Sequence, residues 1–202
     1  MIVVVDYGVG NVGSIHNMLR KIGARARVSG SAQDIESADK LILPGIGHFG
    51  HGMTKLAQTG LVPVLQAQAL TFKKPILGIC LGMQMMTRGS DESEVPGLGW
   101  IDAATHRFAN TPGIRVPHMG WNTVQPTVKA SLFDHRAAEA ERFYFVHSYF
   151  VQTADPAHVA ARCRYGVEFA AAFEVGNLFG VQFHPEKSHL FGMGLLNRFA
   201  AL

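Results

Sequence analysis

Hydrophobic residues in the first half of this chain gather in short, nearly continuous runs. The runs cover Ile2–Val5, Lys40–Leu43 and Pro75–Cys80, and the first two are followed by turn sequences that contain glycine. Runs of this length and composition are typical of strands that are buried on both faces, as in a parallel sheet. We therefore expect strands at these positions.

The residues between these runs have apolar positions at helical spacing. The predicted helices comprise one with Ile15, Leu19 and Ile22 on one face, a longer one over Met53–Leu70 and a short one over Met83–Thr87. Ser14 is placed to cap the first of them. Strands that alternate with helices pair in parallel through right-handed crossovers, so the first half predicts a parallel α/β arrangement.

The second half is richer in strand signals. Aromatic and β-branched residues gather between Gly, Pro, Asn or Asp, in segments Trp100–Phe108, Trp121–Val124, Phe143–Val151, Val159–Arg164, Phe169–Phe173 and Leu178–Phe183. The spacing of Phe191, Leu195 and Phe199 then predicts a C-terminal helix. The whole pattern indicates a single α/β domain over residues 1–202, a three-layer sandwich with a central, mostly parallel sheet and an antiparallel extension.

Composition narrows the class of protein. Hydrophobic residues make up 48% of the 202 residues and charged residues only 16%, which supports a buried core and disfavours disorder. The formal net charge is +3 and the basic residues do not cluster, so we expect no nucleic-acid partner. No apolar run approaches the roughly 20 residues of a membrane span, and Ile2–Val5 reads as a first strand rather than a signal peptide.

Cysteine usage points to a compartment. The chain has two cysteines, Cys80 and Cys163, which form no C-x-x-C pair. Isolated cysteines are typical of free thiols in a reducing environment, so we expect a cytoplasmic protein. We interpret Cys163, which stands between two arginines in a predicted strand, as a buried structural cysteine.

Cys80 stands at the centre of the sequence Gly78-Ile79-Cys80-Leu81-Gly82, between a predicted strand and a predicted helix. This is the cysteine version of the nucleophile elbow, a strained turn that exposes the reactive atom at the carboxyl end of a sheet. The glycines are needed because side chains there would collide with neighbouring backbone. The helix N-terminus favours a thiolate, and the N–H of Leu81 is placed to stabilise an oxyanion. A buried structural cysteine is the alternative interpretation.

A base and an acid that orients it follow a later strand signal. Residues 178–183 run directly into His184-Pro185-Glu186. Residues i and i+2 of an extended chain project to the same side, so Glu186 can accept the Nδ1–H of His184 and leave the other ring nitrogen facing a thiol. A surface histidine is the alternative, because ten histidines occur in the chain. Together with the elbow, the pattern predicts a triad of Cys80, His184 and Glu186.

A glycine-rich loop, Pro44–Gly50, follows the strand at Lys40–Leu43. At the carboxyl end of a parallel sheet its N–H groups face the crevice where such folds bind ligands. We expect the N–H of Gly47 to complete an oxyanion hole with that of Leu81, although a plain connecting loop is the alternative. His48 and His51 form an H-x-x-H pair, but no third ligand type accompanies them and we expect no metal site.

The segment Gly8–Gly13 fits the dinucleotide-binding pattern G-x-G-x-x-G directly after the first strand. That pattern also requires an acidic residue about twenty residues further on, at the end of the next strand. The sequence there reads Ala26–Ser29 and contains no acid. We therefore interpret the segment as a tight loop, with a protein interface as one use for it, and predict no cofactor.

Three segments together resemble the class I (triad) glutamine amidotransferases, which have a flavodoxin-like fold. They are Pro44–Gly47, Gly78–Gln84 and Gln182–Glu186, and the resemblance covers essentially the whole chain. Three more, Tyr7–Asn11, Val116–Asn122 and Phe145–Tyr149, resemble the glutaminase subunits of imidazole glycerol phosphate synthases. The resemblance implies hydrolysis of L-glutamine to glutamate and ammonia through a thioester on Cys80.

The resemblance also implies which residues hold the substrate. The positions that match are the side chains of Gln84 and Glu92, with backbone from His147, Ser148 and Tyr149. Gln84 lies one helical turn after Cys80, which places it within reach of the same site. Glu92 belongs to the acidic stretch Asp91–Glu94, for which a solvated loop is the alternative, and Glu94 competes with it for the role.

In such enzymes the ammonia passes to a separate cyclase subunit with a (β/α)₈ barrel, which produces imidazole glycerol phosphate and a purine precursor. The resemblance therefore implies a heterodimer that channels ammonia, as part of histidine biosynthesis. Asn11 and Trp121 match positions that the family places near the partner, with a turn asparagine and a half-buried aromatic residue as the alternatives. The stretch Met85–Gly89 is more polar than the usual helix there, so the end of that helix departs from the pattern.

Other functions share parts of this pattern. An amidotransferase paralogue that supplies ammonia to a different synthase, for example in a surface-sugar pathway, has most of the same motifs. A cysteine hydrolase or redox sensor acting alone shares the elbow, but Gln84 and the position of Glu186 argue against it. A regulatory subunit without catalysis is disfavoured because all three triad residues are present.

Overall fold

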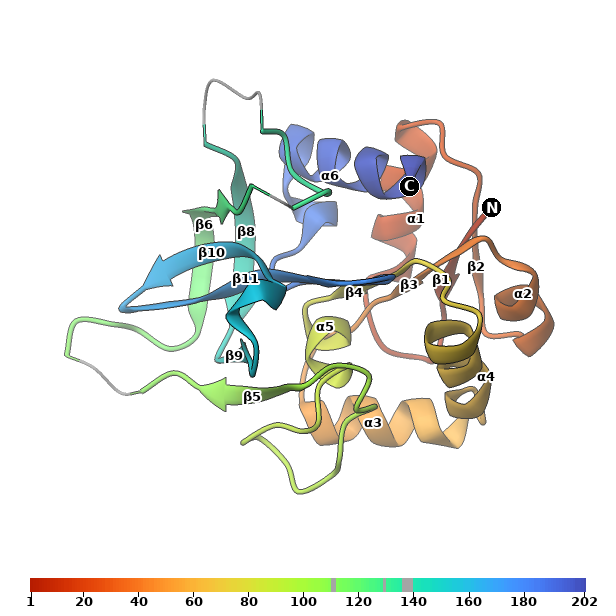
Figure 1. Ribbon diagram of the computed structural model, residues 1–202, viewed down its shortest axis with the longest axis horizontal. Coiled ribbons are helices and arrows are strands. Elements are labelled where there is room, and N and C mark those ends of the chain that lie inside the picture. The colour runs from red at the N-terminus through yellow and green to blue at the C-terminus, as the bar shows by residue number, and fades with distance from the viewer. Residues whose placement is uncertain (110–111, 129, 136–139) are drawn as a thin grey trace.

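The computed structural model describes residues 1–109, 112–128, 130–135 and 140–202. Within these residues a ten-stranded sheet forms the middle layer (Figure 1). The parallel part has the order β2-β1-β3-β4-β12. Its strands are β1 (Ile2–Val5), β2 (Ala26–Ser29), β3 (Lys40–Leu43), β4 (Ile76–Ile79) and β12 (Leu178–Val181). The three runs predicted as strands are therefore confirmed as neighbours at its centre.

Helices cover both faces of this sheet because its central strands are apolar on both sides. One face packs against α1 (Val12–Lys21) and α6 (His189–Ala201), through residues such as Leu19 and Phe199. The other face packs against α2 (Ala32–Ser37), α3 (Phe49–Gln58), α4 (Val62–Gln66) and α5 (Leu81–Met85). Two hydrophobic clusters thus lie on opposite sides of the sheet, as a three-layer α/β sandwich requires (Figure 1).

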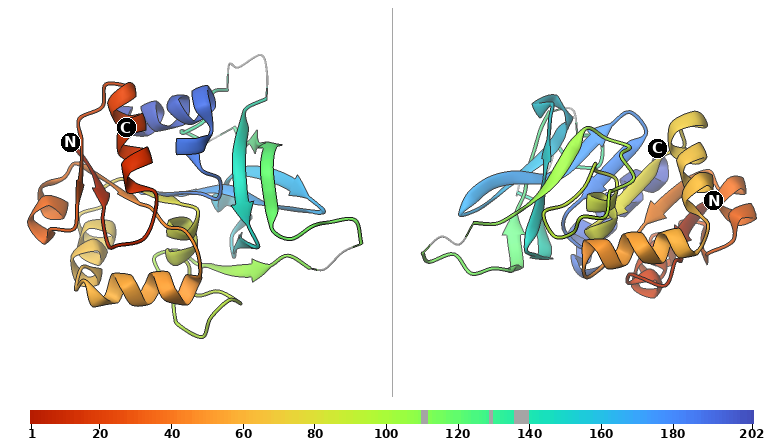
Figure 2. Two further views of the ribbon diagram at one scale, coloured as in Figure 1. Left: turned by 180° about the vertical axis from the view of Figure 1, so that it is seen from behind. Right: turned by 90° about the horizontal axis from the view of Figure 1, so that it is seen from below.

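The sheet continues beyond β12 as an antiparallel extension. It contains β11 (Val167–Val175), β10 (Val159–Tyr165), β7 (Gln125–Pro126), β9 (Tyr149–Thr153) and β5 (Ala103–Arg107). A separate antiparallel pair, β6 (His118–Thr123) and β8 (Arg142–His147), stands beside this extension (Figure 2). The predicted fold class, mostly parallel with an antiparallel second half, is confirmed.

Several predicted boundaries were wrong for local reasons. The long helix over Met53–Leu70 is divided at Gly60, whose φ of +71° ends α3, and the chain resumes as α4 and a π-helical turn over Ala67–Thr71. Ser14 does not cap α1, because the helix already begins at Val12 and Ser14 lies inside its first turn.

Two further predicted boundaries were wrong, one for the helix after Cys80 and one for the strand predicted over Phe143–Val151. The helix predicted over Met83–Thr87 begins earlier, directly after Cys80, and ends at Met85. At its end the N–H and the hydroxyl of Thr87 both donate to the carbonyl of Gln84, so the chain leaves the α-helix in a tight turn. The strand predicted over Phe143–Val151 is two strands, which meet at Ser148.

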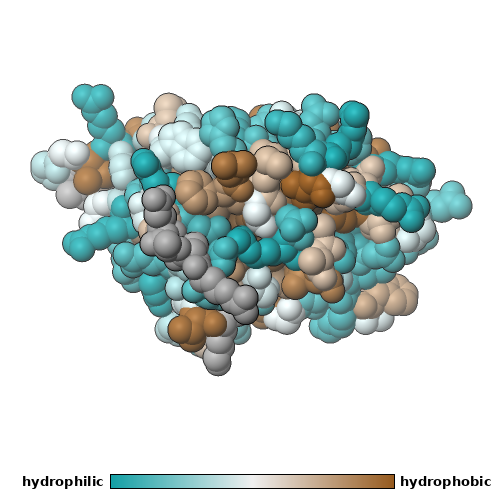
Figure 3. All heavy atoms as spheres, turned by 90° about the horizontal axis from the view of Figure 1, so that it is seen from above, coloured by the Kyte–Doolittle hydropathy of each residue, from teal (hydrophilic) through white to brown (hydrophobic). Residues whose placement is uncertain are grey.

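The outer surface of the α1 and α6 layer is mostly hydrophilic, with small apolar areas between polar side chains (Figure 3). In the described part of the chain, every helix is too short or too polar to span a bilayer.

Candidate active site

Cys80 lies on a sharp turn between β4 and α5, with backbone angles φ 53° and ψ −107°. A positive φ is strained for a residue with a side chain and is found where the surroundings enforce it. A Cβ on Gly82 would lie 1.9 Å from the carbonyl oxygen of Leu43, and one on Gly78 would lie 2.7 Å from the nitrogen of Met83. The turn therefore requires glycine on both sides, which confirms the steric reason predicted for the G-x-C-x-G sequence.

His184 and Glu186 lie on a short 3₁₀ turn, Pro185–Lys187, directly after β12. The Nδ1 atom of His184 lies 2.8 Å from Oε1 of Glu186, and both side chains are only 1% exposed. A carboxylate accepts, so Nδ1 donates and Nε2 is the ring nitrogen left for Cys80. Within the described residues Nε2 has no hydrogen-bond partner. β12 pairs in parallel with β4, so His184 and Cys80 emerge from adjacent strands at the same edge of the sheet.

The surroundings of His184 favour its charged form. Burial alone lowers the pKa of this imidazole, but the nearby Cys80 and the hydrogen-bonded carboxylate of Glu186 outweigh burial and raise it to about 10. Burial likewise favours the neutral form of Glu186, yet its bonds to His184 and Asn11 hold the pKa of this carboxyl below the usual value. The arrangement thus stabilises an imidazolium between the sulfur of Cys80 and the carboxylate of Glu186.

Asn11, which the resemblance places near a partner, reaches the same group of side chains. Its Nδ2 atom donates to Oε1 of Glu186 at 3.1 Å, so that oxygen accepts from both Asn11 and His184. The residue stands between β1 and α1, in the glycine-rich segment that fits the dinucleotide pattern. There Gly10 has a φ of +117°, and a Cβ on it would lie 3.0 Å from the side chain of Pro44. This glycine therefore allows close packing of two loops.

A cavity of about 540 Å³ opens beside Cys80. All the residues predicted for the oxyanion hole and the substrate line it, namely Gly47, Leu81, Gln84, Glu92, His147, Ser148 and Tyr149. Asn11 and His184 line it as well. Trp121 does not, because it lies on β6, where its ring stacks on that of His189 at 5.5 Å and remains 40% exposed.

Gln182 contacts Cys80, a position that the sequence interpretation missed. Its Nε2 atom lies 3.6 Å from the sulfur of Cys80, and its Oε1 accepts from Nε2 of Gln84 at 3.0 Å. A signal was available, because residues i and i+2 of an extended chain share a side and Gln182 stands two positions before His184. Gln84 also donates to the carbonyl of Tyr149 at 3.1 Å, so both protons of its amide are used.

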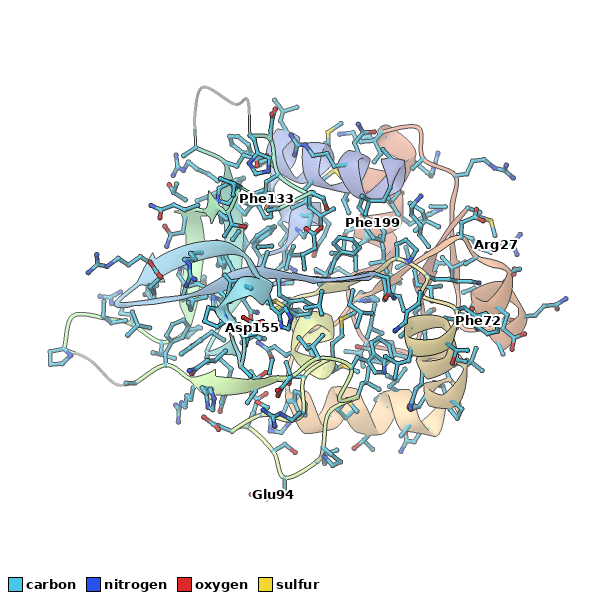
Figure 4. All side chains as sticks on the ribbon, viewed as in Figure 1. Arg27, Phe72, Glu94, Phe133, Asp155 and Phe199 are labelled. Carbon is cyan, nitrogen blue, oxygen red and sulfur yellow. The ribbon has the colours of Figure 1, made fainter. Side chains whose placement is uncertain are left out.

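The two acidic candidates after α5 differ in position. Glu92 lines the cavity, and its Oε2 accepts the N–H of Phe49 at 2.7 Å, at the start of α3. Glu94 lies exposed at the outer end of its loop, away from the strand ends (Figure 4). His48 accepts the N–H of Gly50 and so caps α3. Among the described residues, no group of three or more His, Cys, Asp or Glu side chains is placed to hold a metal ion.

The glycine-rich loop after β3 passes close to the elbow. A Cβ on Gly45 would lie 2.8 Å from Cβ of Leu81, so the two backbones are in direct contact there. Tyr7 holds the start of this loop, because its hydroxyl donates to the carbonyl of Pro44 at 2.7 Å. Burial and the nearby Cys80 raise the pKa of Tyr7, which keeps its hydroxyl protonated as a donor. Gly47 has a φ of +85° and faces the cavity.

The chain is similar to known proteins over its full length. The model of the family described as glutamine amidotransferase class-I matches residues 3–201. A protein named imidazole glycerol phosphate synthase subunit HisH 2, from Pseudomonas aeruginosa, is 50% identical over 202 residues and is covered completely, as is this chain. The protein of the same name from Methanococcus maripaludis is 47% identical, with 98% of each chain covered.

Solved structures give the same fold at lower identity. One described as a glutamine amidotransferase aligns with a TM-score of 0.76 and 17% identity, over 100% of this chain and 99% of the other. The structure of PurLQS from Thermotoga maritima aligns with a TM-score of 0.73 and 22% identity, over 98% and 95%. The match to the family model and the full-length identity to its members agree, and the chain belongs to the class I glutamine amidotransferases.

Proposed function

We propose that this chain is the glutaminase subunit of an imidazole glycerol phosphate synthase, acting as one domain over residues 1–202. Two relatives with 50% and 47% identity over nearly their full length carry that subunit's name. The observation that carries the chemistry is a nucleophile on a strained turn beside a buried His184–Glu186 pair joined at 2.8 Å. This arrangement suits acyl transfer from an amide to a thiol.

The first half-reaction transfers the glutamine acyl group to Cys80. The thiolate forms a bond to the side-chain amide carbon, and the carbonyl electrons move to oxygen. The pKa of His184, raised to about 10 by Cys80 and Glu186 against the effect of burial, keeps a proton on Nε2. When the tetrahedral intermediate collapses, the C–N bond breaks and this proton goes to nitrogen, which leaves as ammonia.

Water completes the cycle. His184, now neutral, accepts a proton from water as the oxygen attacks the thioester. The C–S bond breaks, glutamate leaves, and the Cys80 thiolate and His184 imidazolium are restored. The N–H groups of Leu81 and Gly47 are the proposed donors to the oxyanion in both halves, which is supported by the direct contact of their two loops and by their places on the cavity wall.

The cavity also contains groups that match the polar ends of glutamine. We assign the carboxylate of Glu92 to the α-ammonium group, because opposite charges pair strongly in a partly buried site. Gln84 presents its Oε1 to an N–H of the substrate, because both protons of its amide are already donated. The backbone of His147, Ser148 and Tyr149, which also lines the cavity, is assigned to the rest of the amino-acid group.

We further propose that the ammonia passes to a cyclase subunit with a (β/α)₈ barrel, in a heterodimer. The relatives are named as subunits, which implies such a partner. Trp121 is assigned to the interface because 40% of this large aromatic residue is exposed. Asn11 is assigned both to that interface and to Glu186, which it bonds directly. Two unpaired cysteines favour the reducing cytoplasm as the compartment.

Release of glutamate from glutamine by the purified chain tests this function. It is measured for the chain alone, with a cognate cyclase subunit, and with the cyclase and its nucleotide substrate. Cys80→Ala is the control. The proposal predicts strong activity in the third condition and none with Cys80→Ala. Activity that does not change when the cyclase is added would indicate a different partner. The absence of activity in every condition would contradict the glutaminase function itself.

A further inference from the structure

A continuous line of hydrogen bonds runs from β6 to the wall of the catalytic cavity. The amide of Asn122 lies 3.2 Å from Nε2 of His118, and Nδ1 of His118 lies 3.0 Å from Nε2 of His147. Nδ1 of His147 lies 2.7 Å from the carbonyl oxygen of Tyr149. That oxygen also accepts from Gln84 at 3.1 Å. None of the steps of glutamine hydrolysis described above uses His118, and His147 enters them only as a segment of backbone.

The direction of this line is fixed at the Tyr149 end. A carbonyl oxygen only accepts, so Nδ1 of His147 carries a proton and donates it. In a neutral imidazole the other nitrogen is then an acceptor, so Nε2 of His147 must accept a hydrogen bond from Nδ1–H of His118. Each ring is therefore held in its Nδ1–H form by its neighbour.

The direction is fixed independently at the Asn122 end. The amide nitrogen of Asn122 also lies 3.1 Å from the carbonyl of Arg164, and its oxygen accepts the N–H of Thr123 at 2.8 Å. Its Nδ2 is thus a donor, which makes Nε2 of His118 an acceptor and leaves the proton on Nδ1. The two ends require the same tautomers, so the whole line is satisfied in one arrangement.

The packing around both rings keeps them neutral. His118 is 2% exposed and His147 is 6% exposed, within a group of aromatic rings. His118 stacks on Phe145 and Tyr165, with ring centres 4.7 and 4.0 Å apart. Burial lowers the pKa of His118 to about 4, and burial together with the nearby histidines lowers that of His147 to about 3. Protonation would place a second proton between the rings and break the line.

The far end of the line sets the geometry of the site. The Tyr149 carbonyl accepts hydrogen bonds from both His147 and Gln84, so its orientation depends on both. The other amide N–H of Gln84 donates to Oε1 of Gln182. The amide nitrogen of Gln182 in turn lies 3.6 Å from the sulfur of Cys80. A rotation of the Tyr149 peptide would therefore release Gln84 and disturb the wall that faces the substrate.

We propose that His118 and His147 are positioning residues for glutamine, which hold the Tyr149 carbonyl and, through it, Gln84 in the orientation that binds the substrate. The inference rests on the proposed glutaminase function. It requires that the polar atoms of the two rings matter in addition to their volume. It also requires that binding of glutamine suffers more than the chemical step, because neither ring touches the reacting atoms.

Matched variants separate polarity from volume. His118→Phe and His147→Phe keep an aromatic ring in the cluster and remove the hydrogen bonds. His147→Asn removes the ring but places an amide nitrogen close to the position of Nδ1, from which it can donate to Tyr149. We expect both Phe variants to raise KM for glutamine about tenfold with kcat within about threefold, since one such bond contributes about 1–1.5 kcal/mol. We expect His147→Asn to recover most of this loss.

Phe169→Leu is the control for loosened packing. Phe169 is buried and its ring centre lies 5.2 Å from that of His147, but it belongs to no part of the hydrogen-bonded line. We expect Phe169→Leu to lower the melting temperature and leave KM unchanged. An equal rise of KM in this control, or Phe variants with the KM of the wild type, would overturn the proposal.

Two readouts do not depend on turnover. The dissociation constant for glutamine, measured by calorimetry in a Cys80→Ala background, should rise about tenfold with each Phe variant. Long-range ¹H–¹⁵N spectra of the unaltered protein should show both rings as Nδ1–H tautomers. A wild type that releases no glutamate but gives both of these results contradicts the proposed function and leaves the positioning role intact. Nε2–H tautomers, or unchanged dissociation constants, sink the positioning role alone.

Discussion

Three buried histidines around one cavity titrate in opposite directions, and their partners explain why. His184 faces a carboxylate and a thiol, which outweigh burial and raise its pKa to about 10. Burial lowers the pKa of His118 to about 4, and burial together with the nearby His118 and His184 lowers that of His147 to about 3. The same residue type is thus suited to proton transfer at His184 and to a fixed hydrogen-bond donor at His118 and His147.

The charge of Glu186 is predicted to set both the rate and its pH dependence. Glu186→Gln retains the volume of the side chain but removes a charge that raises the pKa of His184 against burial. We expect kcat to fall about 10²- to 10⁴-fold, because the imidazole loses its orientation and its stabilised charge. The alkaline limb of the profile of kcat/KM against pH should move to lower pH. An alkaline limb that does not move would show that Glu186 has no influence on His184.

Stability should fall as the solution becomes mildly acidic. Between pH 6.5 and 4.5 an unfolded histidine takes up a proton, whereas folded His118 and His147 remain neutral because their pKa values are about 4 and 3. The free energy of unfolding should therefore decrease by up to about 1.4 kcal/mol per pH unit for each of them. His184 contributes little in this window, because its folded form is fully protonated and its unfolded form also becomes protonated below about pH 6.5. Urea denaturation at several pH values measures this slope, and a double His118→Phe, His147→Phe variant should flatten it.

Among the elements, the contact between β3 and α5 leaves no room for an added side chain. Gly82 sits at the start of α5, where a Cβ would lie 1.9 Å from the carbonyl oxygen of Leu43 on β3. The atom in the way is backbone, so the clash can be relieved only by moving α5 or the strand. Because α5 begins directly after Cys80, either movement changes the position of Cys80.

Gly82→Ala is therefore predicted to lower stability by about 3 kcal/mol or more and to abolish glutaminase activity. Gly13→Ala is the matched control, since Gly13 lies in α1 and a Cβ there has nothing within 4 Å. It should gain about 0.5 kcal/mol from helix propensity and keep its activity. Thermal unfolding and glutamate release measure both effects. Equal tolerance of the two substitutions would contradict the close contact of the elbow with β3.

The sequence predicted those elements whose signal is local. The apolar runs at Ile2–Val5 and Lys40–Leu43 and the glycines of the elbow gave correct strands and a correct turn, because each depends on neighbouring residues alone. The His118–His147 contact joins residues on two paired strands, so no local pattern reveals it. Gln182 lies between these cases, because its side follows from strand spacing but its contact with Cys80 depends on the pairing of β12 with β4.

On the scale of the whole molecule, the antiparallel half forms one wall of the cavity beside Cys80, and Cys80 itself comes from the parallel half. Cys80 and His184 emerge from β4 and β12, while His147 and Tyr149 come from β8 and β9. In the β6–β8 pair, β8 provides His147 to this wall, and β6 carries the exposed Trp121. A partner that binds β6 would therefore lie close to the elements that line the cavity.

Trp121→Ala is predicted to weaken association with the cyclase subunit about tenfold, because exposed aromatic residues contribute strongly to interfaces. The isolated chain should keep its melting temperature within a few degrees, since the Trp121 ring is 40% exposed. Its ring contacts are with His189 and Tyr144 at the surface. Titration calorimetry with the cyclase measures the effect. An unchanged dissociation constant would move the interface away from β6.

The most direct test of the account is covalent labelling of the chain with a halomethyl ketone analogue of glutamine, located by peptide mass spectrometry. The account predicts one label per chain, on Cys80, which an excess of glutamine prevents. Cys163 serves as an internal control, because burial raises the pKa of its thiol to about 12 and it should remain unlabelled. A label on Cys163, or labelling of Cys80 that glutamine does not prevent, would contradict the assignment of Cys80 as the nucleophile of a glutamine site.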